Sequence, residues 1–135
     1  MSFGFADFLN TETPFWEEYI MHEIGVVREV VKTVLRYAEE HNVKEVSEIV
    51  VDIGELSLIV PKYVEDLYPA CVAGTPLEDT KLIINITPGL AICNDCDEIF
   101  NVVENKGCCP KCNSFDKDVL SGRDFMIKQI HVPED

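Results

Sequence analysis

Two Cys-x-x-Cys pairs carry the clearest chemical signal in this sequence. Cys93 and Cys96 form the first pair, and after twelve intervening residues Cys109 and Cys112 form the second. Each pair places two sulfurs on one side of a tight loop, and two such loops complete the tetrahedral shell that suits Zn2+. Because four protein ligands leave no position for water or substrate, we expect a structural zinc ion that drives folding of a small module.

The two remaining cysteines receive other interpretations. Cys108 adjoins the second pair and could compete for the ion, but Cys109 is the better ligand because Pro110 and Cys112 complete the usual loop. We interpret Cys108 as a small exposed residue, with a redox-sensitive spare thiol as the alternative. Cys71 falls on the apolar face of a predicted helix, which indicates a core residue.

The four cysteines have two alternatives to zinc binding: they could hold iron, or they could form disulfide bonds. Iron in place of zinc would make the module a rubredoxin-like electron carrier, although such a carrier does not need the helices and strands that precede it. Disulfide bonds are disfavoured because they are rare in the reducing cytoplasm, the compartment that we expect for this protein. The sequence shows no secretory signal pattern and no apolar run long enough to span a bilayer, so we expect a cytoplasmic protein with reduced thiols.

The charge balance argues against nucleic acid and membranes as partners. Asp and Glu number 25 against 11 Lys and Arg, which gives a net charge of -14. Residues 91–120 carry six acids and three lysines, a sum of -3, whereas a ribbon that binds nucleic acid should be basic. A zinc-ribbon adaptor or a transcription-linked binding module is kept as the alternative function.

Two helices are predicted from the pattern of apolar residues. They recur at helical spacing from Ile24 to about His41, which predicts an amphipathic helix. Pro61 opens a second helix, which Pro69 should kink or split and Gly74 should end.

Three strands are predicted around these helices, over residues 46–54, 81–87 and 125–132. Because a lone strand is not stable, the last one should return to the first sheet, which makes the cysteine module an insertion. We therefore predict an α+β, two-layer α/β fold: two helices on a small three-stranded mixed sheet, with an inserted four-cysteine zinc ribbon. Apolar residues make up 47% of the chain, enough for one compact core.

Several short segments resemble the hydrogenase nickel-incorporation proteins (HypA/HybF). The resemblance runs from Met21 to about Val132, and the combination of segments is more specific than any one of them. Besides the ribbon, the segments are Met21-His22-Glu23-Ile24, Asp52-Ile53-Gly54-Glu55-Leu56-Ser57, Ala73-Gly74-Thr75 and Leu120-Ser121-Gly122-Arg123-Asp124-Phe125.

The resemblance implies a nickel metallochaperone without catalytic activity. It would deliver Ni2+ to the large subunit of nickel-iron hydrogenase together with a maturation GTPase, and in some organisms members also serve urease. The nickel ligands would come from Met21, His22 and Glu23. We divide the chain into a discontinuous nickel-binding domain of residues 21–90 plus 121–135 and a zinc-ribbon domain of residues 91–120. We expect a monomer or a weak homodimer.

The Met-His-Glu segment suits Ni(II) on chemical grounds. Ni(II) gains from a square-planar set of nitrogens, and a free α-amine, the His22 imidazole and the deprotonated amides of His22 and Glu23 would supply one. In this chain, however, the nitrogen of Met21 belongs to a peptide bond. The alternative interpretation of His22 is a polar residue near a helix start.

Residues 1–20 hold six of the twelve aromatic residues and no Lys or Arg. We favour translation from Met21, because these aromatics show no periodic pattern and look poorly integrated with the domain. If the segment is present, one nickel donor is lost and His22 binds only weakly, helped by Glu23 or a partner. Thr13-Pro14 could start a short helix within this segment.

Three further positions have structural interpretations. His41 is expected at a helix C-terminus, where partial positive charge is favourable, and His131 is expected on the last strand with no second ligand beside it in the sequence. Asp97 stands where the family usually has glycine after the second ribbon cysteine. We expect Asp97 in the left-handed conformation at a small cost, with the metal site intact.

Overall fold

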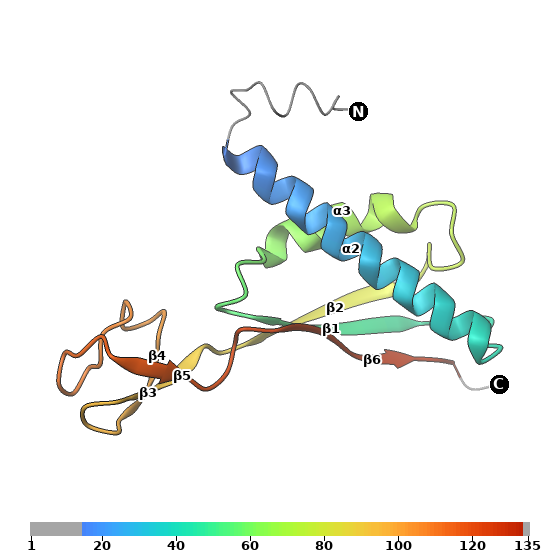
Figure 1. The fold of residues 1–135 in the computed structure, drawn as a ribbon. Helices are drawn as coiled ribbons and strands as arrows, with labels where there is room; N and C mark the ends of the chain where they lie inside the picture. The colour runs from blue at the N-terminus through green and yellow to red at the C-terminus, as the bar shows by residue number, and fades with distance from the viewer. Residues whose placement is uncertain (1–14, 134–135) are drawn as a thin grey trace.

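The computed structural model describes the backbone of residues 15–133 and the side chains from His22 onward. Two helices and three strands form the larger part of the molecule, and three short strands form a separate small sheet (Figure 1). The elements are α2 (Phe15–Glu40), β1 (Glu48–Gly54), α3 (Pro61–Val72), β2 (Lys81–Thr87), β3 (Leu90–Cys93), β4 (Ile99–Asn101), β5 (Lys117–Val119) and β6 (Phe125–His131).

The larger sheet has the strand order β2-β1-β6. β1 pairs in parallel with β2 and antiparallel with β6, with a bulge at Val50/Val51. The last strand therefore returns to the first sheet, as predicted, and β3 to β5 lie between β2 and β6 in sequence. The predicted fold class, two helices on a small mixed sheet with an inserted four-cysteine module, is confirmed. The domain boundaries that we assigned stay a prediction.

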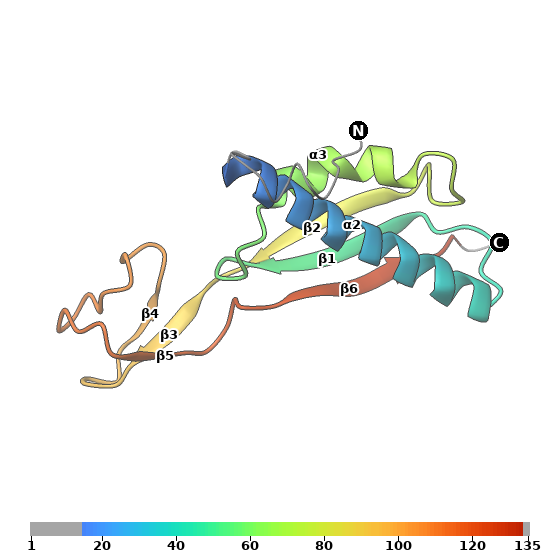
Figure 2. The ribbon, with the colours of Figure 1, turned by 45° about the horizontal axis from the view of Figure 1, so that its top comes forward.

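Both helices cover the same face of the larger sheet, as Figures 1 and 2 show. The side chains of Ile49, Val51 and Ile53 point to that face because side chains alternate along a strand, and all three are fully buried. The helices contribute valines and one tyrosine to the same core, which is apolar at every buried strand position. The helical core residues are Val27, Val30, Val31, Val34, Val64, Tyr68 and Val72.

Helix α2 begins nine residues earlier than the apolar pattern predicts, at Phe15 instead of Ile24. The sequence has no Gly or Pro between these positions, so nothing interrupts the helix. The backbone of residues 15–20 forms the first turns of α2, and our interpretation that the aromatic segment is poorly integrated with the domain stays a prediction. Thr13 and Pro14, where we expected a short helix to start, lie outside the described residues.

Helix α2 ends where we expected, near His41. Asn42 adopts the left-handed conformation with φ of 55°, and the N–H of Val43 bonds to the carbonyl of Ala38 at 2.8 Å. A hydrogen bond to the carbonyl five residues earlier, formed just after a residue in the left-handed conformation, is a common way to satisfy the last carbonyl groups of a helix.

We predicted that Pro69 kinks or splits the second helix. Helix α3 runs through Pro69 as one element, so Pro69 does not split it, and a kink stays a prediction. Pro69 lies in the last turn of α3. The backbone hydrogen bond that its missing N–H removes is close to the helix end, so its loss disturbs little of the helix. The N–H of Ala73 bonds to the carbonyl of Pro69 at 3.2 Å, and Gly74 follows with φ of 76°. Gly74 therefore stands just beyond the helix end, as predicted.

Three glycines, Gly54, Gly89 and Gly122, bring three chain segments into close contact where the larger sheet meets the small one. Gly122 has φ of 89°, and a Cβ atom there would lie 2.6 Å from the Cα of Gly89. A Cβ atom on Gly54 would collide with the carbonyl of Gly122. The N–H of Leu56 bonds to the Gly122 carbonyl at 2.7 Å, and the Ser121 hydroxyl donates to the Pro88 carbonyl at 2.8 Å.

Glu55 links the larger sheet to the small one at the same place. Its Oε1 accepts hydrogen bonds from the N–H of Gly89 at 2.8 Å and from the amide of Asn101, in β4, at 2.9 Å. These two bonds, the one from the Gly89 backbone first, hold the pKa of the Glu55 carboxyl below its ordinary value. Glu55 thus connects the end of β1 to a strand that lies more than forty residues away in the sequence.

Replacing Gly122 with alanine should destabilise the protein by roughly 3 kcal/mol, because the added methyl group combines a left-handed backbone with overlap on Gly89. Gly74→Ala is the matched control. Gly74 also has positive φ, but its Cβ would meet no atom within 4 Å, so a loss of only about 1 kcal/mol is expected. Urea unfolding measures both values, and equal losses would refute the close-packed junction.

Candidate metal centre

The sulfur atoms of Cys93, Cys96, Cys109 and Cys112 converge in the small sheet, all within 4.8 Å of one another. The Sγ–Sγ distances are 3.5 Å for Cys93–Cys112 and 3.5 Å for Cys96–Cys109. A tetrahedron with Zn–S bonds of about 2.3 Å has edges of about 3.8 Å. The donor set and its spacing therefore fit a tetrahedral zinc ion.

The two Cys-x-x-Cys loops have the same backbone hydrogen bonds, which explains why both present their sulfurs in the same way. In the first loop the N–H of Asp97 bonds to the carbonyl of Cys93 at 2.9 Å, and the N–H of Cys93 bonds to the carbonyl of Glu98 at 2.8 Å. The second loop repeats this pattern, with Asn113 bonded to Cys109 at 2.8 Å and Cys109 bonded to Ser114 at 2.9 Å.

The residue after each loop adopts the left-handed conformation. Asp97 has φ of 63° and Asn113 has φ of 64°. Asp and Asn tolerate this region better than most residues other than glycine, because their short side chains bond locally. The expectation for Asp97 is therefore confirmed, and the four sulfurs still converge beside it.

The small sheet has little apolar material with which to fold by itself. Its strand order is β4-β3-β5, and its buried cluster consists only of Ala91, Cys93, Phe100 and Cys109. Two of these four residues are candidate metal ligands. Such a module depends on metal binding for its stability, because so small a core cannot offset the loss of chain entropy.

The electrostatics of the sulfur cluster favour a cation. Burial raises the pKa of the Cys109 thiol, but N–H groups of Cys112 and Lys111 and the nearby sulfurs bring it down to about 7. For Cys112, a backbone bond at Ser114 lowers the pKa, whereas the sulfur of Cys93 and burial raise it, with a net value of about 12. Four adjacent thiolates repel one another, and a bound dication removes this repulsion.

The structure separates the cluster from the two other cysteines. Cys108 lies outside it, and its thiol donates to the carbonyl of Asn113 at 3.1 Å. Cys71 is half-buried on α3 and packs against the main core. Among the residues with described side chains, the four cysteines are the one group of three or more Cys, His, Asp or Glu placed to share an ion.

The Met-His-Glu segment lies within helix α2, far along the chain from the sulfur cluster. His22 has 59% of its side chain exposed, whereas the side chain of Glu23 is fully buried. The Nδ1 atom of His22 lies 3.0 Å from Oε1 of Glu23. The other carboxyl oxygen, Oε2, is buried and has no hydrogen-bond partner among the described groups.

We did not predict from the sequence that Glu23 is buried, although its spacing along the helix indicates it. Glu23 stands four residues before Val27, and both lie on the face of α2 that continues through Val30 and Val34. An acidic residue at a core position of an amphipathic helix is uncommon and calls for a functional or pairing explanation.

The helical backbone of this segment conflicts with the planar nickel set inferred above. In an α-helix each N–H bonds to the carbonyl four residues earlier, so the amides of His22 and Glu23 are already engaged. They become available to a metal only if the first part of α2 opens.

The two other histidines are occupied by local contacts. His41 stacks on Tyr37 with ring centroids 4.0 Å apart, and its Nδ1 lies 2.9 Å from the Tyr37 carbonyl. His131 is exposed on β6, with its Nε2 3.0 Å from the side-chain nitrogen of Gln129. Both positions agree with the structural roles that we expected.

These features define a class of protein: a two-layer α+β domain that carries a four-cysteine metal ribbon as an insertion in its sheet. Neither helix within residues 15–133 combines the length and apolar character needed to cross a membrane.

Comparison with known proteins narrows this class to one family. A family model described as hydrogenase/urease nickel incorporation, metallochaperone, hypA, matches residues 21–132, and the chain belongs to this family. The hydrogenase maturation factor HypA of Trichodesmium erythraeum is 35% identical over 114 residues, covering 84% of this chain and 97% of that protein. The HypA protein of Geobacter sulfurreducens is 34% identical over 112 residues, covering 83% and 99%.

Solved structures share the fold. The solution structure of the Ni metallochaperone HypA from Helicobacter pylori has a TM-score of 0.58 at 20% identity, covering 84% of this chain and 98% of that chain. A second solution structure of a HypA protein has a TM-score of 0.56 at 21% identity, covering 84% and 97%. The chain is thus a member of the nickel metallochaperones of hydrogenase maturation, with a four-sulfur site that fits structural zinc.

Replacing Cys109 with serine should remove the metal and unfold the small sheet, because Cys109 is a fully buried sulfur of the cluster. Cys108→Ser is the matched control, one residue away and outside the cluster. Purified control protein should hold about one zinc ion per chain, and the Cys109 variant should hold almost none. Elemental analysis measures this ratio, and equal zinc contents would exclude Cys109 as a ligand.

Proposed function

We propose that this chain binds Ni(II) at Met21, His22 and Glu23 and delivers it during maturation of nickel-iron hydrogenase. The observation that carries the proposal is the pair of His22 and Glu23, in which an exposed imidazole contacts a fully buried carboxyl group at 3.0 Å. A carboxylate that accepts a hydrogen bond from a ring N–H orients the imidazole and raises its basicity as a ligand.

The Met-His-Glu segment allows two ways of holding nickel, and only the first keeps the contact between His22 and Glu23. In the helix, Nδ1 of His22 faces Glu23, so only Nε2 is free for the metal and binding is weak. When the first turns of α2 are open, Nδ1 and the amides of His22 and Glu23 can join a free amine of Met21 in a planar set. We propose that the planar form loads nickel and requires a chain that begins at Met21, the residue where the match to the family also begins.

Gly25 gives the start of α2 a reason to open. Gly25 is exposed, and a Cβ atom added to it would meet no atom within 4 Å. Close packing therefore does not explain why this position is glycine. Glycine in a helix interior costs about 1 kcal/mol relative to alanine. Gly25 therefore weakens the helix between two buried positions of α2, Glu23 and Val27.

Transfer is proposed to occur without catalysis by this chain. Nickel is cargo, held at the surface and released to a partner, and nothing in the sequence resembles a nucleophile with its base or a phosphate-binding loop. We propose a maturation GTPase and the hydrogenase large subunit as partners, in the cytoplasm, with urease served as well in some organisms. Nucleotide hydrolysis would then belong to the GTPase.

The form that begins at Met21 should bind Ni(II) with low-micromolar affinity and give the diamagnetic, planar spectrum of a nitrogen-rich site. His22→Ala should weaken binding by more than about tenfold, because it removes one of four donors. The 135-residue chain should bind more weakly and give a six-coordinate, paramagnetic signal. Isothermal titration and electronic absorption measure both properties.

His41→Ala is the control for this experiment, because His41 is an exposed histidine just beyond the far end of α2 and its replacement should leave nickel affinity unchanged. If the Met21 form binds nickel equally well with and without the His22 imidazole, the proposed site is wrong. A planar spectrum from the 135-residue chain would contradict the requirement for a free amine.

Gly25→Ala should strengthen the start of α2 by about 1 kcal/mol and lower the nickel affinity of the Met21 form by roughly fivefold, since the planar site needs this turn open. Thr33→Ala, an exposed change farther along the same helix, should also favour the helix but leave nickel affinity unchanged. Thermal melting and nickel titration test the pair. An equal response of affinity to both changes would disconnect helix opening from nickel loading.

A further inference from the structure

Helix α2 carries a row of three basic residues along one face. Arg28, Lys32 and Arg36 are spaced four residues apart, all are exposed, and α2 contains no other Lys or Arg. They span about 12 Å along the helix, at a rise of about 1.5 Å per residue. In a chain with a net charge of -14, three of the 11 basic residues are thus concentrated in one line.

Ion pairs among the side chains from His22 onward do not explain this basic row. Among the described side chains the ion pairs are His22–Glu23 and Lys62–Asp66, so no carboxylate lies within 4.0 Å of any member of the row. Cations four residues apart also repel each other and destabilise a helix slightly. The row therefore costs stability, which points to a ligand that compensates the charge.

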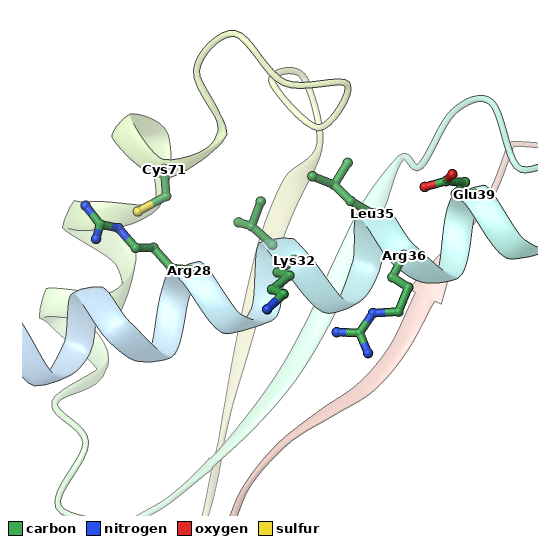
Figure 3. A pocket seen from close by; sticks show the side chains of 7 residues that line it. Arg28, Lys32, Leu35, Arg36, Glu39 and Cys71 are labelled. Carbon is green, nitrogen blue, oxygen red and sulfur yellow. The ribbon is translucent and has the colours of Figure 1, made fainter.

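The basic row borders a groove between α2 and α3 (Figure 3). The groove has a volume of about 430 Å3, and its floor is apolar. Figure 3 shows Arg28 reaching from α2 toward Cys71 of α3, whereas Lys32 and Arg36, farther along α2, extend away from Cys71. Val31, Leu35 and Cys71 supply the apolar surface, and Glu39 stands at the far end of the groove.

We propose that this basic groove docks an acidic amphipathic helix of a partner protein. Carboxylates four residues apart on a helix have the same repeat as the basic row, and apolar side chains between them can contact Val31, Leu35 and Cys71. Because the chain as a whole is strongly acidic, an acidic partner helix is attracted most strongly along the row. The proposal does not depend on where nickel binds.

The short length of the basic row distinguishes this partner from other anions. A nucleic acid or an anionic membrane would extend past the row and meet the acidic surface around it, including Glu39. A short helix with a limited number of carboxylates avoids that repulsion. A small phosphate compound would match the charge but would leave the apolar floor uncovered.

The groove also lies near the Met-His-Glu segment, the proposed nickel site. Arg28 follows His22 by six residues, or about 9 Å of helix rise. A helix seated in the groove would therefore hold its protein beside the Met-His-Glu segment.

The test uses a fluorescent sixteen-residue helical peptide with glutamates four residues apart and leucines between them on the same face. Its control has lysine in place of each glutamate. Fluorescence polarisation with the 135-residue protein should show binding of the acidic peptide only, and the variant R28E/K32E/R36E should weaken it by about tenfold or more. The variant R28Q/K32Q/R36Q should weaken it as well while keeping good helix-forming residues, and circular dichroism checks that both variants fold.

The matched control is K44E/K81E/K128E, which reaches the same net charge of -20 as the charge-reversed variant but leaves the groove intact. It should change the affinity by less than about threefold. The proposal is overturned if the acidic peptide fails to bind, if the two triple charge reversals have equal effects, or if inorganic tripolyphosphate displaces the peptide as strongly as the unlabelled peptide does. Binding to phosphatidylserine vesicles that depends on the basic row would instead assign the groove to membranes and would also overturn it.

Discussion

Hydrogen bonding on both edges of β1 is the constraint on which the rest of the structure depends. One edge pairs in parallel with β2, which follows after α3, and the other pairs antiparallel with β6, which follows after the four-cysteine module. A parallel neighbour requires a crossover, and α3 supplies it on the same face that α2 covers. The fully buried side chains of Ile49, Val51 and Ile53 then anchor both helices to one strand. Because β6 completes this sheet only after the metal module, the module is held at both of its ends.

The two metals of this family differ in the donors that they prefer, and the chain keeps those donors apart. Four thiolates in a closed tetrahedron suit Zn2+, which has no geometric preference from its d electrons. The proposed nickel ligands are nitrogens of Met21, His22 and Glu23, and the exposed imidazole of His22 is where an ion could be gained and lost. The sulfur cluster is built from two rigid loops with identical hydrogen bonds, whereas the His22–Glu23 pair stands next to a glycine that weakens its helix. Rigid and labile sites are thus encoded in different kinds of local structure.

Much of the fold could be predicted because its signals are local in sequence. The segment from Lys81 to Thr87 is rich in isoleucine, which favours a strand, and the doubled Cys-x-x-Cys spacing identifies the two metal loops without tertiary information. The start of α2 was predicted too late, although Trp16 and Ile20 stand at helical spacing before Ile24 and no Gly or Pro interrupts the segment. The contacts of Glu55 and the packing of Gly122 join residues more than thirty positions apart, so no sequence window contains both partners. Charge placement was also hidden, since the overall acidity conceals the basic row on α2.

The glycine junction limits how the metal ribbon can move. A module attached through a single linker can swivel about that linker, but here two antiparallel connections, at Pro88–Gly89 and Ser121–Gly122, are bonded to each other and to the end of β1. Torsion about either connection alone would break those bonds, so the remaining freedom is a bend across both. A force that another molecule applies to the metal ribbon is therefore transmitted to β1, the central strand of the larger sheet, because no flexible linker separates the two.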